Sequence, residues 1–140
     1  MNQIDPTILI VDDDASIRFA LTDALRSWNY DSRAAGTIAE AASMLDEDPP
    51  AVVLLDIDLP DGSGLDLLGR IKAENADTIV IMITGNVGMP NVLAAFRSGA
   101  HDFVGKPVKL EELRLTIKNA LETRDLRREV QRTRRERSSA

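Results

Sequence analysis

Three short apolar runs, none of them interrupted by alternating polar residues, constrain the fold of this chain more than any other feature. They are Thr7–Val11, Ala51–Leu55 and Thr78–Ile83. Runs of this length that are rich in β-branched residues are typical of strands buried on both faces, as in parallel sheets. We therefore predict a parallel sheet with helices packed on both of its sides.

Three helices are predicted between and after these runs, where apolar residues recur at helical spacing. The first contains Ile17 to Trp28, the second Ile38 to Leu45 and the third Leu65 to Ile71. A Ser, Thr or Asp side chain just before a helix accepts a hydrogen bond from a free N–H group of its first turn. The predicted N-caps, in chain order, are Asp14 or Ser16, Thr37 and Ser63.

The last part of the chain continues the alternation of strands and helices. Pro90 suits the first turn of a helix that ends before Gly99. A short strand is expected at His101–Val104, and Leu110 begins a long helix that we expect to reach about Arg135. Five strands alternating with five helices, joined by short loops, predict an α/β fold with right-handed crossovers.

The composition is that of a single globular domain: 140 residues, of which 44% are hydrophobic and 29% charged. No apolar run approaches the roughly 18 residues that span a bilayer. The first five residues do not form a signal peptide. We expect no membrane association and a cytoplasmic location. Because the chain has no cysteine and a single histidine, His101, any metal would be held by oxygen ligands.

The net charge of −6 is unevenly distributed, since the segment from Leu121 onward has seven arginines and only four acidic residues. We interpret residues 1–122 as the domain and 123–140 as an Arg/Glu-rich helical linker. The acidic domain would repel nucleic acid. There is no Walker A loop and no helix-turn-helix candidate after residue 110, so we expect this chain neither to hydrolyse ATP nor to bind DNA.

Acidic, hydroxyl and ammonium side chains follow the predicted strands where each strand ends. The carboxyl ends of parallel strands meet at one edge of an open sheet, and ligands bind there. Two carboxylates about 4 Å apart repel by about 4 kcal/mol at an effective dielectric near 20, so such a group needs a compensating cation. The residues are Asp12, Asp13 and Asp14, then Asp56, Asp58 and Asp61, then Thr84, and finally Lys106 with Pro107.

Phosphoryl transfer is the chemistry that these groups favour together. An all-oxygen site favours Mg²⁺, which typically takes one or two carboxylates plus phosphate oxygens. An aspartate such as Asp56 can attack phosphorus and form an aspartyl phosphate. Lys106 would then balance the charge of the phosphoryl group, and the Thr84 hydroxyl would hydrogen-bond one of its oxygens. Each residue alone is ordinary loop chemistry, but their conjunction at successive strand ends is specific.

The sequence resembles the receiver domain of two-component response regulators over about residues 6–122. The motifs that carry the resemblance are Ile10–Asp14, Leu54–Gly64, Ile83–Gly85 and Gly105–Pro107. The resemblance implies a flavodoxin-like (βα)5 doubly wound parallel sheet with strand order 2-1-3-4-5 in three αβα layers. It also implies a signalling domain rather than an enzyme, phosphorylated by a sensor histidine kinase.

The resemblance assigns the acceptor and the metal ligands. Asp56 is implied to be the phosphoryl acceptor. Asp13 and Asp56 are implied to bind Mg²⁺ directly together with the backbone carbonyl of Asp58, while Asp12 acts through water.

The resemblance also assigns Lys106 and Thr84 to the phosphoryl oxygens, and it implies a cis peptide bond between Lys106 and Pro107. Thr84 and Phe103 are implied to form a switch pair. Their movement would remodel the surface made by helix four, strand five and helix five.

Three residues depart from the family pattern. Asp14 adds a third acid to the usual pair, and we interpret it as a helix cap. Val108 stands where a Phe often follows Lys-Pro, which would alter the packing under helix five. Asp58 places a carboxylate where many relatives carry a neutral group, and our hypothesis is that it slows phosphorylation or changes dephosphorylation.

The Arg-rich last helix resembles the segment that, in NtrC-type regulators, links the receiver to an AAA+ ATPase activating sigma-54 transcription. The resemblance implies a homodimer formed through helices four and five and this C-terminal helix. It also implies a longer regulator that binds DNA, of which the sequence is the N-terminal piece.

Three other functions would use part of this pattern. A haloacid-dehalogenase-like phosphatase would use Asp56 and Asp58, but it needs an acidic pair after the lysine, where only Glu111 and Glu112 follow, inside a helix. A flavodoxin-like electron carrier would want hydrogen-bond donors, not acids, after the first strand. A pseudo-receiver that binds partners without phosphorylation is disfavoured by the intact Asp56, Thr84 and Lys106.

Overall fold

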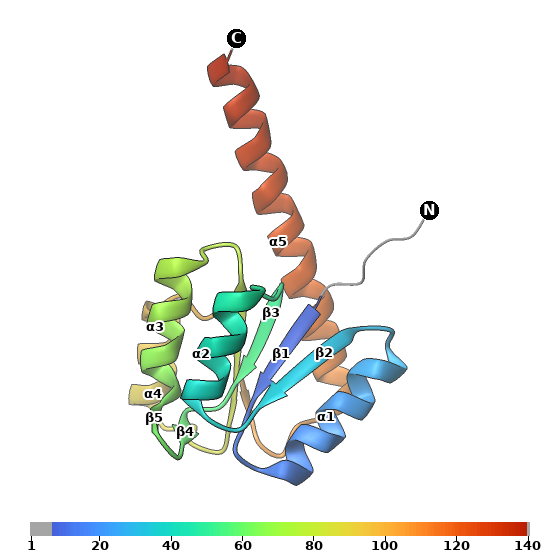
Figure 1. Cartoon of the computed structure of the whole chain (residues 1–140), viewed down its shortest axis with the longest axis vertical. Coiled ribbons are helices and arrows are strands. Elements are labelled where there is room, and N and C mark those ends of the chain that lie inside the picture. The colour runs from blue at the N-terminus through green and yellow to red at the C-terminus, as the bar shows by residue number, and fades with distance from the viewer. Residues whose placement is uncertain (1–6, 140) are drawn as a thin grey trace.

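The computed structural model of the chain describes residues 7–139. It is an α/β fold of three layers, with a central sheet between two groups of helices (Figure 1). The strands are β1 (Thr7–Val11), β2 (Asp31–Ala35), β3 (Val52–Leu55), β4 (Asp58–Leu59), β5 (Gly62–Ser63), β6 (Ile79–Thr84) and β7 (Asp102–Gly105). The helices are α1 (Ala15–Ser27), α2 (Ile38–Glu47), α3 (Gly64–Glu74), α4 (Met89–Arg97) and α5 (Leu110–Ser139).

The central sheet has the order β2-β1-β3-β6-β7, and all of its strand pairs are parallel. Counted along the sheet strands alone, this is the predicted order 2-1-3-4-5, so the predicted fold class is confirmed. The antiparallel hairpin of β4 and β5 lies outside this sheet. It was not predicted, because two residues per strand are too few to carry a recognisable pattern.

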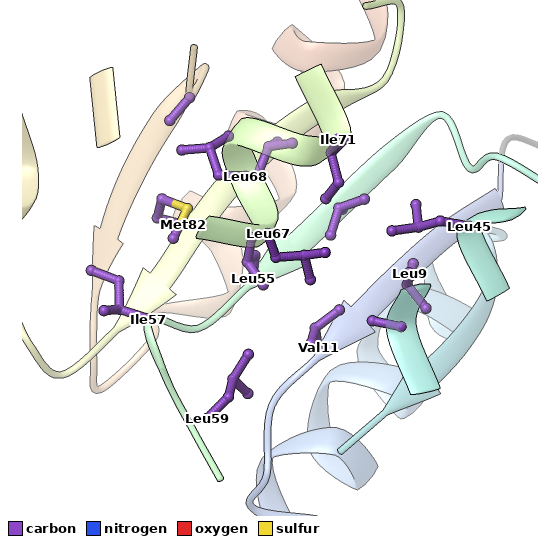
Figure 2. Close-up of a cluster of buried hydrophobic side chains, with 14 of the residues drawn as sticks. Leu9, Val11, Leu45, Leu55, Ile57, Leu59, Leu67, Leu68, Ile71 and Met82 are labelled. Atoms are coloured by element: carbon purple, nitrogen blue, oxygen red, sulfur yellow. The ribbon is translucent and has the colours of Figure 1, made fainter. Parts of the chain in front are cut away.

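Alternate side chains of the buried strands pack on opposite faces of the sheet. In β3, Val53 and Leu55 pack with α2, α3 and α4, whereas Val52 and Leu54 pack with α1 and α5. Figure 2 shows the first of these two cores, with side chains of β1, β3 and β6 meeting those of α2 and α3. Both faces are covered, which explains why the strand sequences are apolar without alternation.

All three predicted helix starts have the expected caps. The Asp14 carboxylate accepts a hydrogen bond from the Ser16 N–H (2.8 Å) and so caps α1, as predicted for the extra acid. Thr37 caps α2 and Ser63 caps α3, each through its hydroxyl oxygen. Because these caps lie directly after strand ends, they fix where the loops at this edge of the sheet begin and end.

Helix α5 is longer than predicted, since it continues to Ser139 rather than to about Arg135. Its second half extends away from the three layers (Figure 1), and every side chain from residue 125 to 137 is exposed. The segment contains no Gly or Pro that would end a helix. Over the described residues, no helix combines the length and apolarity that crossing a membrane requires.

Candidate functional site

The loops after β1, β3 and β7 bring Asp12, Asp56 and Lys106 together at the carboxyl edge of the sheet. The Lys106 ammonium donates to Asp12 Oδ2 at 2.7 Å and to Asp56 Oδ2 at 2.8 Å. Asp12 is only 2% exposed and Asp56 only 6%. A single cation therefore bridges two buried carboxylates that would otherwise repel one another.

Burial and ion pairing shift the pKa of Lys106 in opposite directions. Burial by itself would lower the pKa of this amine, but the hydrogen bonds and charges of Asp12 and Asp56 outweigh it and raise the pKa above its ordinary value of 10.5. The amine is therefore charged throughout the physiological range. The sequence predicted Lys106 as a partner of phosphoryl oxygens; in the structure its partners are the two carboxylates.

Asp13 completes a cluster of three carboxylates. One oxygen each from Asp12, Asp13 and Asp56 lies within 4.8 Å of the others. Asp13 is exposed, and among residues 7–139 nothing donates a hydrogen bond to its carboxylate. Clustered carboxylate oxygens, with no sulfur or nitrogen donor, fit a hard divalent cation such as Mg²⁺.

Asp58 lies beside this cluster, in the first strand of the β4–β5 hairpin. Its backbone N–H donates to Asp56 Oδ1 at 3.3 Å, and its own carboxylate is exposed. The Asn86 side-chain amide lies 3.5 Å from Asp58 Oδ1, from the loop after β6. Sequence reasoning did not identify Asn86, because one Asn after a strand is ordinary loop composition.

Thr84 and Phe103 lie on the neighbouring strands β6 and β7. Thr84 is completely buried, and its hydroxyl accepts a hydrogen bond from the Asn86 N–H at 3.2 Å. Phe103 is half-buried and packs against the core beneath α4. In the strand register Phe103 is opposite Met82, while Thr84 is opposite Gly105. Thr84 and Phe103 are thus offset by two residues along adjacent strands, and the switch between them stays a prediction.

The segment after Lys106 holds the start of α5. The Lys106–Pro107 peptide bond is cis. Val108, which departs from the family pattern, is half-buried and packs into the core between α1 and α5. The smaller side chain is therefore accommodated under α5.

Gly64 fixes the position of the acceptor loop, a role that sequence reasoning missed. Its N–H donates to the Ile57 carbonyl at 2.7 Å. A Cβ atom at this position would lie 1.9 Å from the Asp56 carbonyl oxygen. Any larger residue would push the backbone of the phosphoacceptor candidate away from α3.

Asp61 lies in the turn of the β4–β5 hairpin, as predicted, and it also caps α2 from a distance in sequence. Its carboxylate accepts hydrogen bonds from the N–H groups of Ile38 (2.8 Å) and Ala39 (3.0 Å). These bonds lower the pKa of Asp61 below its ordinary value of 3.8. The hairpin that follows Asp56 is thereby tied to α2.

Replacing Asp61 by Asn is expected to reduce stability in a pH-dependent way. A carboxyl whose pKa is lowered by folding stabilises the fold above its unfolded value, and this contribution is lost as the pH falls through the lowered folded value. The melting temperature of Asp61→Asn should lie below that of the parent at pH 7, and the gap should narrow as the pH falls below about 3.8 and through the lowered folded pKa. Thermal unfolding followed by circular dichroism from pH 7 to pH 3 measures this. Asp23→Asn, an exposed site on α1, is the control, and a gap that is constant with pH would contradict the assignment.

The comparison with protein families decides what kind of domain this is. The model of the family described as the response regulator receiver domain matches residues 8–118. The chain belongs to this family. The receiver domain is a signalling domain, and the motifs predicted to carry the resemblance all lie in or next to the matched range.

Among similar proteins, the response regulator protein PilR of Pseudomonas aeruginosa is 40% identical over 117 residues, covering 84% of this chain and 26% of PilR. The nitrogen assimilation regulatory protein NtrX of Azorhizobium caulinodans is 38% identical over 129 residues, covering 88% of this chain and 28% of NtrX. The predicted likeness to NtrC-type regulators is confirmed by these matches. The receiver spans about a quarter of the length of these relatives.

Solved structures agree on the fold. NtrX from Brucella abortus superposes with a TM-score of 0.86 at 35% identity, covering 93% of this chain and 30% of that one. A CheY-like receiver domain from Methanospirillum hungatei also has a TM-score of 0.86, at 29% identity, covering 89% of this chain and 99% of that one. Because the chain belongs to the receiver family, we reject the two alternative functions, a haloacid-dehalogenase-like phosphatase and a flavodoxin-like electron carrier. Consistently, Glu111 and Glu112 are exposed on α5 and are not part of the carboxylate cluster.

Proposed function

We propose that this receiver accepts a phosphoryl group on Asp56 from a sensor histidine kinase. The observation that carries the proposal is the bridge from Lys106 to two buried carboxylates, beside a third carboxylate that accepts no hydrogen bond within residues 7–139. A buried Asp that is paired with an ammonium group at a sheet edge has the surroundings that an attacking carboxylate needs.

In the proposed reaction an oxygen of Asp56 attacks the phosphorus of a phosphohistidine. The new P–O bond forms as the P–N bond breaks, and the histidine imidazole leaves with the bonding electrons. Lys106 stays charged and neutralises the oxygens of the transferring group, to which the Thr84 hydroxyl donates a hydrogen bond. Because Lys106 is already bonded to the acceptor Asp56, its positive charge is in place before transfer.

Mg²⁺, when bound, would supply positive charge that neutralises the phosphoryl oxygens. Asp13, Asp56 and the backbone carbonyl of Asp58 are the proposed direct ligands, and Asp12 is the proposed ligand through water. The three clustered carboxylates support this set.

The proposed output is a change in the surface of α4, β7 and α5, driven by Thr84 and Phe103. This surface already exposes apolar side chains, including Leu93 (45% exposed) and Phe96 (46%) on α4. We propose that phosphorylation controls homodimerisation through α4, α5 and the linker, residues 123–140. In the whole cytoplasmic regulator, this would control a DNA-binding, sigma-54-dependent output of the NtrC type.

Incubation with acetyl phosphate tests the proposal without knowledge of the kinase. We expect intact-protein mass spectrometry to show the gain of one phosphoryl group in the presence of Mg²⁺ and no gain in excess EDTA. A domain that takes up no phosphoryl group under either condition would instead be a pseudo-receiver. Uptake that is equal with and without Mg²⁺ would contradict the metal assignment.

Replacing Asp58 by Asn is expected to accelerate phosphorylation. The Asp58 carboxylate adds negative charge next to an attacking carboxylate and an anionic donor. Because the Asp58 side chain is exposed, solvent screens much of this repulsion, and a several-fold increase in the phosphorylation rate is expected when the charge is removed. Rates of gain and loss of the phosphoryl mass measure the effect. Equal rates in Asp58→Asn and the parent for both gain and loss would reject it.

A further inference from the structure

Arg18 on α1 bonds to the backbone of the loop that carries Asp12 and Asp13 of the carboxylate cluster. Its guanidinium Nη1 donates to the backbone carbonyl of Asp12 at 2.8 Å. Arg18 is half-buried and lies over Gly36, from which a Cβ atom would be only 3.1 Å from Nη1. The side chain is therefore confined between the loop after β1 and the loop after β2.

The peptide groups on both sides of Asp13 are held by this arrangement. The Asp12 carbonyl, which belongs to the peptide preceding Asp13, accepts the bond from Arg18. The Asp14 N–H, which belongs to the peptide following Asp13, donates to Asp12 Oδ1 at 2.9 Å. Because the Asp13 carboxylate itself has no hydrogen-bond donor among residues 7–139, its direction depends on these two peptides.

We propose that Arg18 is a positioning residue for the divalent cation: by holding the Asp12 carbonyl it aims the carboxylate of Asp13 at Asp12 and Asp56. This inference rests on the proposed Mg²⁺ site. Residues that orient metal ligands without touching the metal commonly change affinity by about 10- to 100-fold when they are removed.

The charge of Arg18 and its positioning role have opposite effects on Mg²⁺ affinity. A guanidinium near the cluster repels a second cation, so its removal would tighten Mg²⁺ binding if charge were its main influence. Loss of the fixed peptide would weaken binding instead. Titration in about 1 M NaCl, where the screening length is about 3 Å, suppresses the charge effect and leaves the positioning effect.

Mg²⁺ titration by calorimetry on the whole chain tests the proposal with three variants. Arg18→Met is expected to weaken Mg²⁺ binding by about tenfold or more. Arg18→Lys retains a donor that can reach the carbonyl and should recover part of the affinity. Arg26→Met removes an exposed arginine of the same helix and should bind Mg²⁺ as the parent does.

Melting temperatures in EDTA show whether Arg18 affects Mg²⁺ binding or only the stability of the fold. A purely structural Arg18 would lower the melting temperature in EDTA without changing the Mg²⁺ affinity of the folded protein. If Arg18→Met does not fold, Gly36→Ala keeps the arginine but crowds its guanidinium, and it should weaken Mg²⁺ binding in the same direction by a smaller factor.

Mg²⁺ binding by Arg18→Met equal to or tighter than that of the parent would overturn the inference, as would an equal loss in Arg26→Met. A parent protein that binds no Mg²⁺ would instead overturn the proposed metal site itself. The two failures are thus distinguishable in one series of titrations.

Discussion

Lys106→Met is expected to destabilise the receiver by about 3 kcal/mol in the absence of divalent cations, since removing one partner of a buried ion pair leaves an uncompensated charge. The value is at the low end of the usual range because the lysine side chain is 20% exposed, whereas those of Asp12 and Asp56 are only 3% and 8% exposed. Millimolar Mg²⁺ should restore part of the loss, because the cation replaces the missing positive charge. Urea unfolding in EDTA and in Mg²⁺ measures both effects.

The same substitution should have opposite effects on the two proposed functions of the site. Mg²⁺ should bind more tightly to Lys106→Met, because a competing positive charge is gone. Phosphoryl uptake should fall by about 100-fold or more, because the donor to the transferring group is lost. Lys109→Met is the control: its ion pair with Glu112 is exposed and 4.0 Å long, so we expect a change within about 0.5 kcal/mol. Equal losses in the two variants would contradict the role given to Lys106.

Gly64→Ala is expected to cost at least about 3 kcal/mol, the upper end for overpacking. The added methyl group would lie 1.9 Å from the Asp56 carbonyl oxygen, and a backbone atom cannot move aside as a flexible side chain can. The displaced loop carries the acceptor, so the folded fraction should also lose phosphoryl uptake. Denaturant unfolding and acetyl phosphate labelling measure the two losses.

Gly69→Ala on the same helix is a control that we expect to change stability in the opposite direction. Nothing lies within 4 Å of a Cβ atom at Gly69, which is exposed in the interior of α3. Alanine is favoured over glycine in helix interiors by roughly 0.5–1 kcal/mol, so this variant should be more stable than the parent. If Gly64→Ala were as stable as Gly69→Ala, the loop after β3 would be able to move and accommodate the methyl group, which would contradict the prediction.

The central strands and the edge where the site lies could be predicted because their patterns are local. An uninterrupted apolar run identifies a strand buried on both faces, and the residue after each run is then placed at the common edge. Asp12, Asp56 and Lys106 meet for this reason. The strand β2 has no such run: its sequence, Asp31–Ala35, is polar because it forms an edge of the sheet.

The contacts that fix the site's loops could not be predicted, because they join residues far apart or depend on backbone geometry. Asp61 caps α2 across 23 residues, and no sequence pattern connects the two. Arg18 bonds to a backbone carbonyl, which every residue possesses. Gly64 is required by a close approach of two backbones that exists only once α3 packs beside β3. Sequence spacing therefore predicted which groups meet, but not what orients them.

Locating the phosphoryl group tests the central claim most directly. After treatment with acetyl phosphate and Mg²⁺, reduction with borohydride converts an aspartyl phosphate to homoserine, which peptide mass spectrometry assigns to one position. We expect homoserine at position 56 alone, and none in the Asp56→Asn protein. Homoserine at Asp12, Asp13 or Asp58, or a phosphoryl mass that persists in Asp56→Asn, would contradict the account of this site.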